Sequence, residues 1–378
     1  MVAAAVAAFV AGIVWLPSTA ALAFGMVLAL VGVRFLKSEL LRTASLSIAA
    51  VMFALTAIEA VAVEMTPKAI NSGVNKTHTP WDWLPYNAIL GYRPRPATAV
   101  TAVATRGEET VFRAVYTIDA SGVRAAPGSA PDSTQAGKPY LFIGDSFVFG
   151  EGLPDADTLP AQFAREANSK ARVVNLGVVG YGAEHLVRAL ETGLYDSYAP
   201  GGAKAVITWI IPQQLPRVTG DGNWLGDAPR YVLDGSAAVP RFTGTFFEHR
   251  LFNPFAGALY LAREKFKAVA LATNAARERQ QADLFVALFA RLKQLAQERF
   301  GAPLVVVHLW PDTVRKDDAN SVYVPILLAI RDLGVRTISV DKMIGIHDRS
   351  PYYIPIDGHP NARLNDLIAQ ALKAQLEP

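Results

Sequence analysis

The sequence predicts an α/β domain with a parallel β-sheet covered by helices on both faces, preceded by an N-terminal bundle of transmembrane helices. From residue 139 onward, short apolar runs typical of strands alternate with longer helix-like runs, as in sheets that are buried on both faces. Before residue 65 the chain is almost entirely apolar. We therefore expect a membrane region at 1–64, a connecting region at 65–137 and a soluble domain at 138–378.

Three apolar stretches make up the membrane region, at 2–16, 19–36 and 43–64. A spanning helix needs about 20 apolar residues, which the third stretch meets, the second nearly meets and the first meets least well. Between the second and third stretches lies a basic cluster of Arg34, Lys37 and Arg42. Positive charge favours the cytoplasmic side. We therefore expect a multi-pass protein of the bacterial inner membrane, with its C-terminal domain in the periplasm.

Two features of the membrane region qualify this interpretation. A cleaved signal peptide is the alternative for residues 1–20, but the stretch has no basic N-terminal segment and the two later stretches would stay unexplained. Glu59 lies within the third stretch, where a charge facing lipid is costly. We expect Glu59 to face another helix or the membrane interface.

The connecting region divides into a linker and a β-rich extension of the soluble domain. Residues 65–85 carry scattered polar residues and prolines, which predicts a juxtamembrane linker. The segments YNAILGYRPRP and TVFRAVYTIDASGVRAAPG predict extended strands, with a turn at 119–122. The stretch at 129–138 reads as a loop.

The soluble domain shows five apolar runs of strand length. These are 139–144, 172–176, 204–211, 303–309 and 335–340. Helix-like runs follow at 158–169, 183–194, 256–299 in one or two pieces, 322–333 and 361–376. The first of these helices starts at Asp157-Thr158, with Pro160 in its first turn. Functional side chains in such sheets gather at the carboxyl ends of the strands.

Two segments supply the residue types of a nucleophilic serine site. The first predicted strand runs through LFIGDSFVFG and delivers Ser146 into a turn before a helix. Near the C-terminus, IPIDGHPNARL places Asp357 and His359 in a loop before the last helix. A serine nucleophile needs a base and a carboxylate that orients the base. Taken singly, an ordinary loop at Ser146 and a turn with a capping histidine at 357–359 remain open readings.

A third segment, VVNLGVVGYG at 173–182, ends in a glycine-rich turn where Gly180 has no side chain to block an approaching oxyanion. Together the three segments make residues 138–378 resemble the SGNH hydrolase superfamily, also called GDSL-type esterases. The resemblance implies a flavodoxin-like parallel sheet. It also implies Ser146 as nucleophile and oxyanion donor, Gly180 as second donor, His359 as general base and Asp357 as its orienting partner. The segment Tyr-x-x-Asp-x-x-Gly-x-Arg at 116–124 is similar to the extension of membrane-bound relatives.

The chain departs from the family pattern at the third oxyanion donor. Family members usually have an Asn after the third strand, whereas here the strand runs into Pro212-Gln213-Gln214. Gln213 keeps a carboxamide and is our candidate for the donor, with a plain polar loop residue as the alternative. Loss of one donor typically lowers turnover by about 10²–10³. The single residue between Asp357 and His359 resembles the spacing in related enzymes that act on bacterial surface glycans.

The segment at 212–255 is an expected insertion, rich in Gly, Pro and aromatic residues. Its aromatic residues are Trp224, Tyr231, Phe242, Phe246 and Phe247. It reads either as a substrate-binding lid or as a structural flap packed on its own core. Asp221, Asn223 and Asp227 resemble a sparse calcium loop, but the acidic ligands are too few to favour a metal. Core or surface roles are preferred for His185, His308 and His347.

Composition excludes several other classes of function. The net charge is only +3 over 378 residues, without a long basic run, so we expect no nucleic-acid partner. The chain has no cysteine, which excludes disulfides and thiolate metal sites. No phosphate-binding glycine motif is present, and we expect no cofactor or metal. The expected partners are the lipid bilayer, a glycan or acyl-ester substrate, and possible membrane-protein neighbours.

The sequence thus predicts a membrane-anchored periplasmic serine esterase or O-acyltransferase with a Ser-His-Asp triad. The preferred substrate, from anchoring and resemblance, is an acyl ester, above all acetyl, on an envelope or exported polysaccharide. Whether water or a sugar accepts the acyl group is left open. The alternative is a non-catalytic subunit or assembly factor of a membrane complex, which the missing Asn and the elaborate anchor favour.

Overall fold

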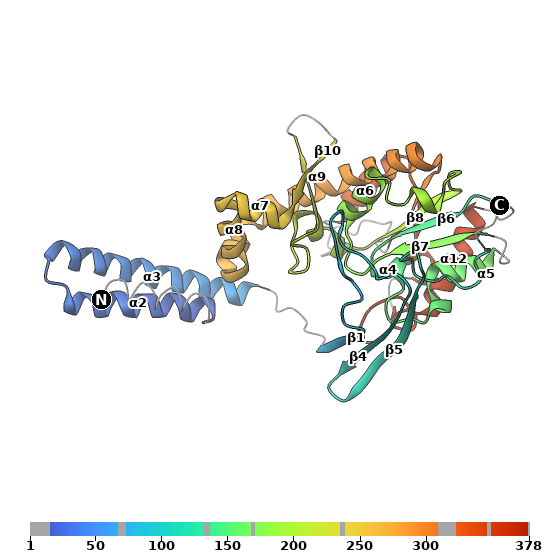
Figure 1. Ribbon diagram of the computed structural model, residues 1–378. Coiled ribbons are helices and arrows are strands. Elements are labelled where there is room, and N and C mark those ends of the chain that lie inside the picture. The colour runs from blue at the N-terminus through green and yellow to red at the C-terminus, as the bar shows by residue number, and fades with distance from the viewer. Residues whose placement is uncertain are drawn as a thin grey trace. The chain divides into compact units, whose positions relative to one another are not determined.

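The computed structural model describes residues 16–66, 73–131, 137–167, 171–234, 239–308, 323–345 and 349–376 (Figure 1). The chain divides into two compact units. The first comprises Met1–Ile70 and His249–Arg279, and the second comprises Asn71–Glu248 and Gln280–Pro378.

The first unit contains a helical hairpin of α2 (Ser18–Phe35) and α3 (Glu39–Met65), which lie side by side (Figure 1). Both helices are long and apolar enough to cross a membrane. The Ser45 hydroxyl of α3 donates to the Ala29 carbonyl of α2 over 2.6 Å, so a polar contact fixes the hairpin where the helices meet. The predicted first span at 2–16 lies outside the described residues, except for Leu16.

Glu59 joins the hairpin to a distant part of the chain within the same unit. Its side chain is buried, and its two oxygens accept hydrogen bonds from the backbone N–H groups of Lys267 (2.8 Å) and Ala268 (2.9 Å). These residues begin α9 (Lys267–Phe300), which follows α7 (Phe246–Phe252) and α8 (Pro254–Lys265). A carboxylate at a helix N-terminus satisfies N–H groups that have no acceptor within the helix. The prediction that Glu59 faces another helix is confirmed.

The second unit is built on a five-stranded parallel sheet. Its strands are β6 (Tyr140–Gly144), β7 (Val173–Gly177), β8 (Ala205–Ile210), β11 (Leu304–His308) and β12 (Arg336–Ser339), in spatial order β12-β11-β8-β6-β7. Numbered along the chain from the other edge, this is the order 2-1-3-4-5 of flavodoxin-like sheets. The predicted fold class is confirmed, and all five strands lie where the apolar runs predict them.

Alternation along the strands produces two cores, one on each face of the sheet. In β6, Leu141 and Ile143 belong to the core that also contains α6 (Ala183–Glu191), α10 (Tyr323–Asp332) and the C-terminal half of α9. Tyr140 and Phe142 belong to the other core, together with α5 (Leu159–Glu166) and α12 (Ala362–Leu376). Because successive side chains point to opposite faces, a continuous apolar run serves both cores at once. The short helix α11 (Val340–Ile344) follows β12.

The β-rich extension forms an antiparallel sheet of three strands, β1 (Val74–Thr79), β4 (Thr98–Arg106) and β5 (Glu109–Ile118). Between β1 and β4 along the chain, strands β2 (Tyr86–Asn87) and β3 (Gly91–Tyr92) form a small antiparallel pair. The prediction of a linker throughout 65–85 is wrong at β1. That strand reads VNKTHT, is mostly exposed and shows no apolar alternation, so only its pairing with β4 reveals it.

The predicted insertion contains a hairpin of β9 (Pro229–Leu233) and β10 (Pro240–Thr245). Within it, Tyr231 is buried in the core beside α6, and Leu225, Ala228 and Phe246 form a small cluster of their own. This part of the insertion is therefore a packed flap. Trp224 is the exception, because half of its surface is exposed.

Candidate active site

Ser146 begins a short helix at the carboxyl end of β6. Strand β6 ends at Gly144, and α4 (Ser146–Phe149) follows with Asp145 as its N-cap, whose carboxylate accepts the Phe147 N–H at 3.0 Å. A side chain at Gly144 would place its Cβ 2.5 Å from Val148, so only glycine allows the helix to start so close to the strand. The serine thus follows β6, one of the two strands at the point where the strand order reverses and ligands bind in sheets of this type.

The three residues predicted for catalysis form one continuous chain of contacts. His359 Nε2 lies 2.8 Å from Ser146 Oγ, and His359 Nδ1 lies 2.5 Å from Asp357 Oδ2. The imidazole therefore reaches both partners, one from each ring nitrogen. With the Nδ1 proton donated to the carboxylate, Nε2 is free to accept the hydroxyl proton of the serine.

The turn around Asp357 explains how Asp357 and His359 can contact each other with only one residue between them in the chain. Gly358 has φ +82° and Ile356 has φ +68°, so left-handed residues flank Asp357 on both sides. A β-branched residue with positive φ is strained. The Gly358 N–H donates to the Ile354 carbonyl at 2.9 Å, and the Ile354 N–H donates to the His359 carbonyl at 2.7 Å. This tight fold brings both side chains of the Asp-x-His segment to the same place.

The electrostatic surroundings favour an ionised Asp357. Burial of the carboxyl raises its pKa, but the hydrogen bond and charge of His359, with the charge of Lys76, outweigh burial and hold the pKa at about 2. The side chain is almost fully buried, with 2% of its surface exposed. A carboxylate that stays ionised at neutral pH can orient the imidazole and stabilise its protonated form.

Two backbone N–H groups at the site have no acceptor among the described residues, those of Ser146 and Gly180. Gly180 has φ +81°, and a Cβ there would lie 2.6 Å from the Tyr92 hydroxyl. That hydroxyl donates to the Val179 carbonyl at 2.8 Å. Because a trans peptide points its N–H away from its C=O, this bond fixes the direction of the Gly180 N–H. Donors held in advance are what an oxyanion site requires.

The segment after β8 differs from the expectation in one residue. Gln213 is exposed, whereas the neighbouring Gln214 is buried and donates through Nε2 to Asp145 Oδ2 at 2.9 Å. Arg217 donates to the same oxygen at 3.0 Å and to the Tyr181 carbonyl at 2.6 Å. The buried carboxamide of this loop thus supports the turn that carries Ser146. The donor role of Gln213 remains a prediction.

Two charged residues at the site were not found by sequence reasoning. Glu151 Oε2 lies 3.3 Å from His359 Nε2, so a second carboxylate faces the imidazole. Lys76 Nζ lies 2.7 Å from Asp357 Oδ1 and 2.8 Å from Glu151 Oε1. No local pattern marks either residue. The proximity of Glu151 to the serine segment, five positions after Ser146, was the available signal.

An apolar pocket of about 410 Å³ opens beside Gly180. It is lined by Leu84, Tyr92, Val179, Gly180 and Trp224. The Trp224 indole N–H donates to the Gly180 carbonyl at 3.2 Å, which holds the ring at the pocket. The aromatic residue that the sequence places in a lid therefore lies next to a predicted oxyanion donor.

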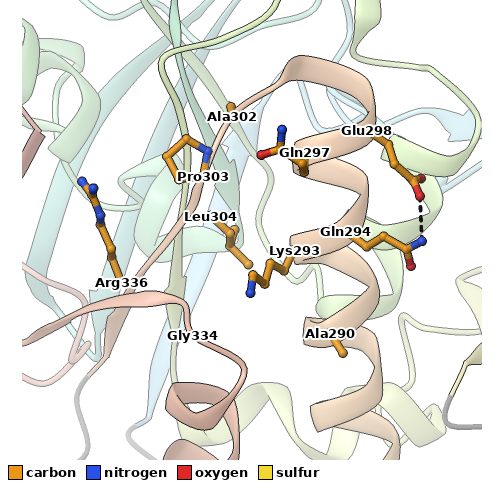
Figure 2. Close-up of a pocket in the computed structure, with 10 residues that line it drawn as sticks. All are labelled: Ala290, Lys293, Gln294, Gln297, Glu298, Ala302, Pro303, Leu304, Gly334 and Arg336. Carbon is orange, nitrogen blue, oxygen red and sulfur yellow. Dashed lines mark hydrogen bonds between the residues drawn. The ribbon is translucent and has the colours of Figure 1, made fainter.

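A second pocket, of about 500 Å³, lies at the opposite end of the sheet strands (Figure 2). Its lining includes Lys293 and Gln297 of α9, and Pro303 and Leu304 at the start of β11. The amino ends of parallel strands are not where flavodoxin-like sheets bind ligands. The pocket in Figure 2 also contains none of the residues predicted for catalysis.

The remaining candidate ligands have structural roles where they are described. His185 and His308 are buried in the protein core, and His185 stacks on Tyr181 with ring centroids 4.3 Å apart. Asp221 accepts a hydrogen bond from Gln281 at 2.9 Å. Within the described ranges no group of three His, Asp or Glu side chains is arranged to hold a metal ion. His347 lies outside the described residues.

Comparison with known proteins gives matches among solved structures only. No family model matches the chain, and no curated protein sequence matches it. The crystal structure of TesA is 14% identical, covers 64% of this chain and 99% of its own, and has a TM-score of 0.37. AlinE4, an SGNH-hydrolase family esterase, is 15% identical, with 64% and 97% covered and a TM-score of 0.32.

A third similar structure is that of an enzyme that acts on carbohydrate esters. It is a carbohydrate esterase family 2 enzyme with a carbohydrate-binding domain, from Corynascus thermopiles (Myceliophthora fergusii). It is 14% identical, with 68% of this chain and 70% of that chain covered and a TM-score of 0.32.

Proposed function

We propose that this chain is a membrane-anchored serine esterase or O-acyltransferase of the SGNH type, facing the bacterial periplasm. Its substrate would be an acyl ester, above all acetyl, on an envelope or exported polysaccharide. The observation that carries the proposal is the contact chain from Ser146 Oγ through His359 to Asp357, with distances of 2.8 and 2.5 Å. Such a chain is the recognised geometry of an activated serine.

The proposed reaction follows from this geometry. His359 Nε2 takes the hydroxyl proton while Ser146 Oγ attacks the ester carbonyl, and the N–H groups of Ser146 and Gly180 stabilise the oxyanion. The imidazolium then returns the proton to the departing sugar oxygen as the C–O bond breaks, which leaves an acyl-serine. Water or a sugar hydroxyl attacks this acyl group, gives its proton to His359 and restores Ser146.

The pocket beside Gly180 supports a glycan substrate. Trp224 is half exposed there, and Leu84 and Tyr92 add further apolar surface. A flat aromatic face suits the apolar face of a sugar ring as well as an acyl chain, so the pocket lies where either part of the ester would be held. Replacement of Trp224 by Ala should raise KM for an acetylated glycan more than for p-nitrophenyl acetate, which has no sugar ring.

The second candidate is a non-catalytic SGNH-like subunit or assembly factor of a membrane complex. The departure from the family pattern favours it, because Gln213 stands where family members usually have an Asn donor, and its side chain is exposed. If α2 and α3, which are long and apolar enough to cross a membrane, both span it, they would provide more membrane contact than tethering one domain requires. Under this alternative the serine would be unreactive and the chain would co-purify with membrane proteins at fixed stoichiometry.

A fluorophosphonate serine probe on the detergent-solubilised full chain separates the two candidates. We expect labelling of the wild type and none of Ser146→Ala or His359→Ala, with the exposed Ser197→Ala as a matched control that labels normally. A folded wild type that resists the probe would refute the enzyme proposal. If the wild type is labelled, acetate release from p-nitrophenyl acetate is measured with and without a sugar acceptor. Hydrolysis releases acetate in both cases, whereas transfer moves the acetyl group to the sugar.

The proposed location can be tested with single cysteines, because the natural chain has none. A Cys at Ser197 in the soluble unit and one at Lys37 between α2 and α3 would be offered to a membrane-impermeant maleimide on intact spheroplasts. We expect Ser197→Cys to react and Lys37→Cys to react only after lysis. The reverse pattern would place the soluble unit in the cytoplasm.

A further inference from the structure

We propose that Lys76 is a positioning residue that keeps the general base His359 deprotonated by neutralising the two carboxylates that face it. The inference rests on the proposed function and deepens it. His359 contacts Asp357 Oδ2 at 2.5 Å through Nδ1 and lies 3.3 Å from Glu151 Oε2 through Nε2. Lys76 Nζ bridges the same two carboxylates at 2.7 and 2.8 Å.

Two carboxylates around one imidazole create a difficulty for catalysis. Each opposite charge within about 4–6 Å favours the protonated imidazole by about one to three pKa units. A histidine that already carries a second proton cannot accept the proton of Ser146. The ammonium of Lys76, in contact with both carboxylates, opposes this effect.

The extension sheet holds Lys76 in this place. Lys76 lies on β1, paired with Ala104 of β4, and its Nζ lies 5.7 Å from the centre of the Phe112 ring on β5. Burial lowers the pKa of Lys76, but the charges of Glu151 and Asp357 outweigh it and raise the pKa above its ordinary value. The ammonium is therefore charged throughout the working range, and the extension contributes directly to the site.

Other titratable groups packed around the cluster do not replace Lys76. They are His78 on β1, Tyr116 on β5 and Arg124. Burial lowers the pKa of His78, whose ring packs against Trp83. Tyr116 accepts the Gly152 N–H, and burial raises its pKa. Arg124 binds backbone carbonyls and Asp155. Among the described residues, Lys76 is the cation that contacts both carboxylates.

Glu151 has the opposite effect to Lys76. Once Ser146 has given up its proton, the Nε2–H of the imidazolium faces Glu151 Oε2 as well as the serine oxygen. The carboxylate therefore stabilises the protonated base, and Lys76 limits that stabilisation. The two residues form a matched pair whose removal should move the pKa of His359 in opposite directions.

The test is the pH dependence of the rate of fluorophosphonate labelling, measured on the full chain from pH 5 to 9. Reactivity requires deprotonated His359, so it falls as the pH drops through the pKa of that group. We expect Lys76→Met to shift this fall upward by about one unit or more and Glu151→Gln to shift it downward. Lys76→Arg should keep the wild-type position, and the double variant Lys76→Met/Glu151→Gln should return close to it.

A merely structural role would give a different result. Loss of packing would lower the labelling rate by the same factor at every pH, and the double variant would be worse than either single one. Either outcome would overturn the inference while leaving the serine reactive and the proposed function intact.

Titration of the His359 ring by NMR separates the inference from the enzyme activity. The spectra would be taken on the full chain in the Ser146→Ala background, with His359→Gln to assign the signal. An unreactive wild type would refute the proposed function. The inference would then stand if the His359 pKa still rises in Lys76→Met and falls in Glu151→Gln, and would fail if neither variant moves it.

Discussion

Arg124 clamps the turn that follows the serine helix, and its removal gives the most quantitative prediction. Its side chain is fully buried. It donates to the carbonyls of Phe149 (2.6 Å), Gly150 (2.7 Å) and Leu153 (2.6 Å) and pairs with Asp155 at 3.1 Å. These carbonyls bracket Glu151, so the clamp positions one of the charged groups at His359.

The expected cost of Arg124→Met follows from these contacts. A hydrogen bond from a charged donor contributes about 1.5–3 kcal/mol, which gives roughly 5–9 kcal/mol for three carbonyls if the terms added. Contacts within one network are not additive, and breaking a buried pair typically costs about 3–5 kcal/mol. We therefore expect a loss of at least about 4 kcal/mol in the free energy of unfolding.

Urea unfolding followed by tryptophan fluorescence measures this loss, and Arg113→Met on the exposed face of β5 is the matched control. Arg113→Met should change the free energy of unfolding by less than about 0.5 kcal/mol. Arg124→Lys keeps the charge but not the planar set of donors, so it should recover only part of the loss. A cost below about 1 kcal/mol for Arg124→Met would refute the clamp.

Three further predictions concern the site itself. Tyr92→Phe removes the hydrogen bond that fixes the Val179 peptide and should slow serine labelling by about three- to tenfold; an unchanged rate would argue against Gly180 as an oriented donor. Gln213→Ala should change labelling by less than about twofold, whereas Gln214→Ala should lower the free energy of unfolding by about 1–3 kcal/mol; a 100-fold loss in Gln213→Ala would instead support its predicted donor role. Asp357 has its pKa lowered from 3.8 to about 2, so its ionised form adds roughly 2 kcal/mol of stability that is present above about pH 4 and lost as the pH falls toward 2. Wild type and Asp357→Asn should therefore differ at pH 7 and converge at pH 2 in urea titrations, and a constant difference would contradict this.

The parallel strands of the second unit could be predicted from the sequence because they are largely buried on both faces. The run AVITWI of β8 is apolar at nearly every position, since its side chains fill the cores on both sides of the sheet. The residues of the serine site could be found for a related reason. At Gly144 and Gly180 a Cβ would clash with neighbouring atoms, and Gly358 has a positive φ that favours glycine; such glycines are visible in a sequence.

Lys76 and Glu151 could not be predicted in the same way. They are 75 residues apart, and their contact depends on β1, a strand whose pairing is not encoded in any apolar alternation. The different exposure of Gln213 and Gln214 could not be predicted from the sequence either. Both lie in one short 3₁₀ turn at Pro212–Gln214, where a change of one position reverses exposure. Sequence pattern finds such a loop but does not orient its side chains.

The hydrogen bonds of Glu59 have a consequence for how the chain is made. The N–H group that meets this carboxylate belongs to a residue 208 positions later, so α3 leaves the ribosome long before α9 begins. During that interval an apolar helix of spanning length carries a carboxylate that still lacks these N–H donors. A chain truncated before Lys267 would therefore leave the Glu59 carboxylate without these two donors, and the first unit is completed only after the start of α9 has been made.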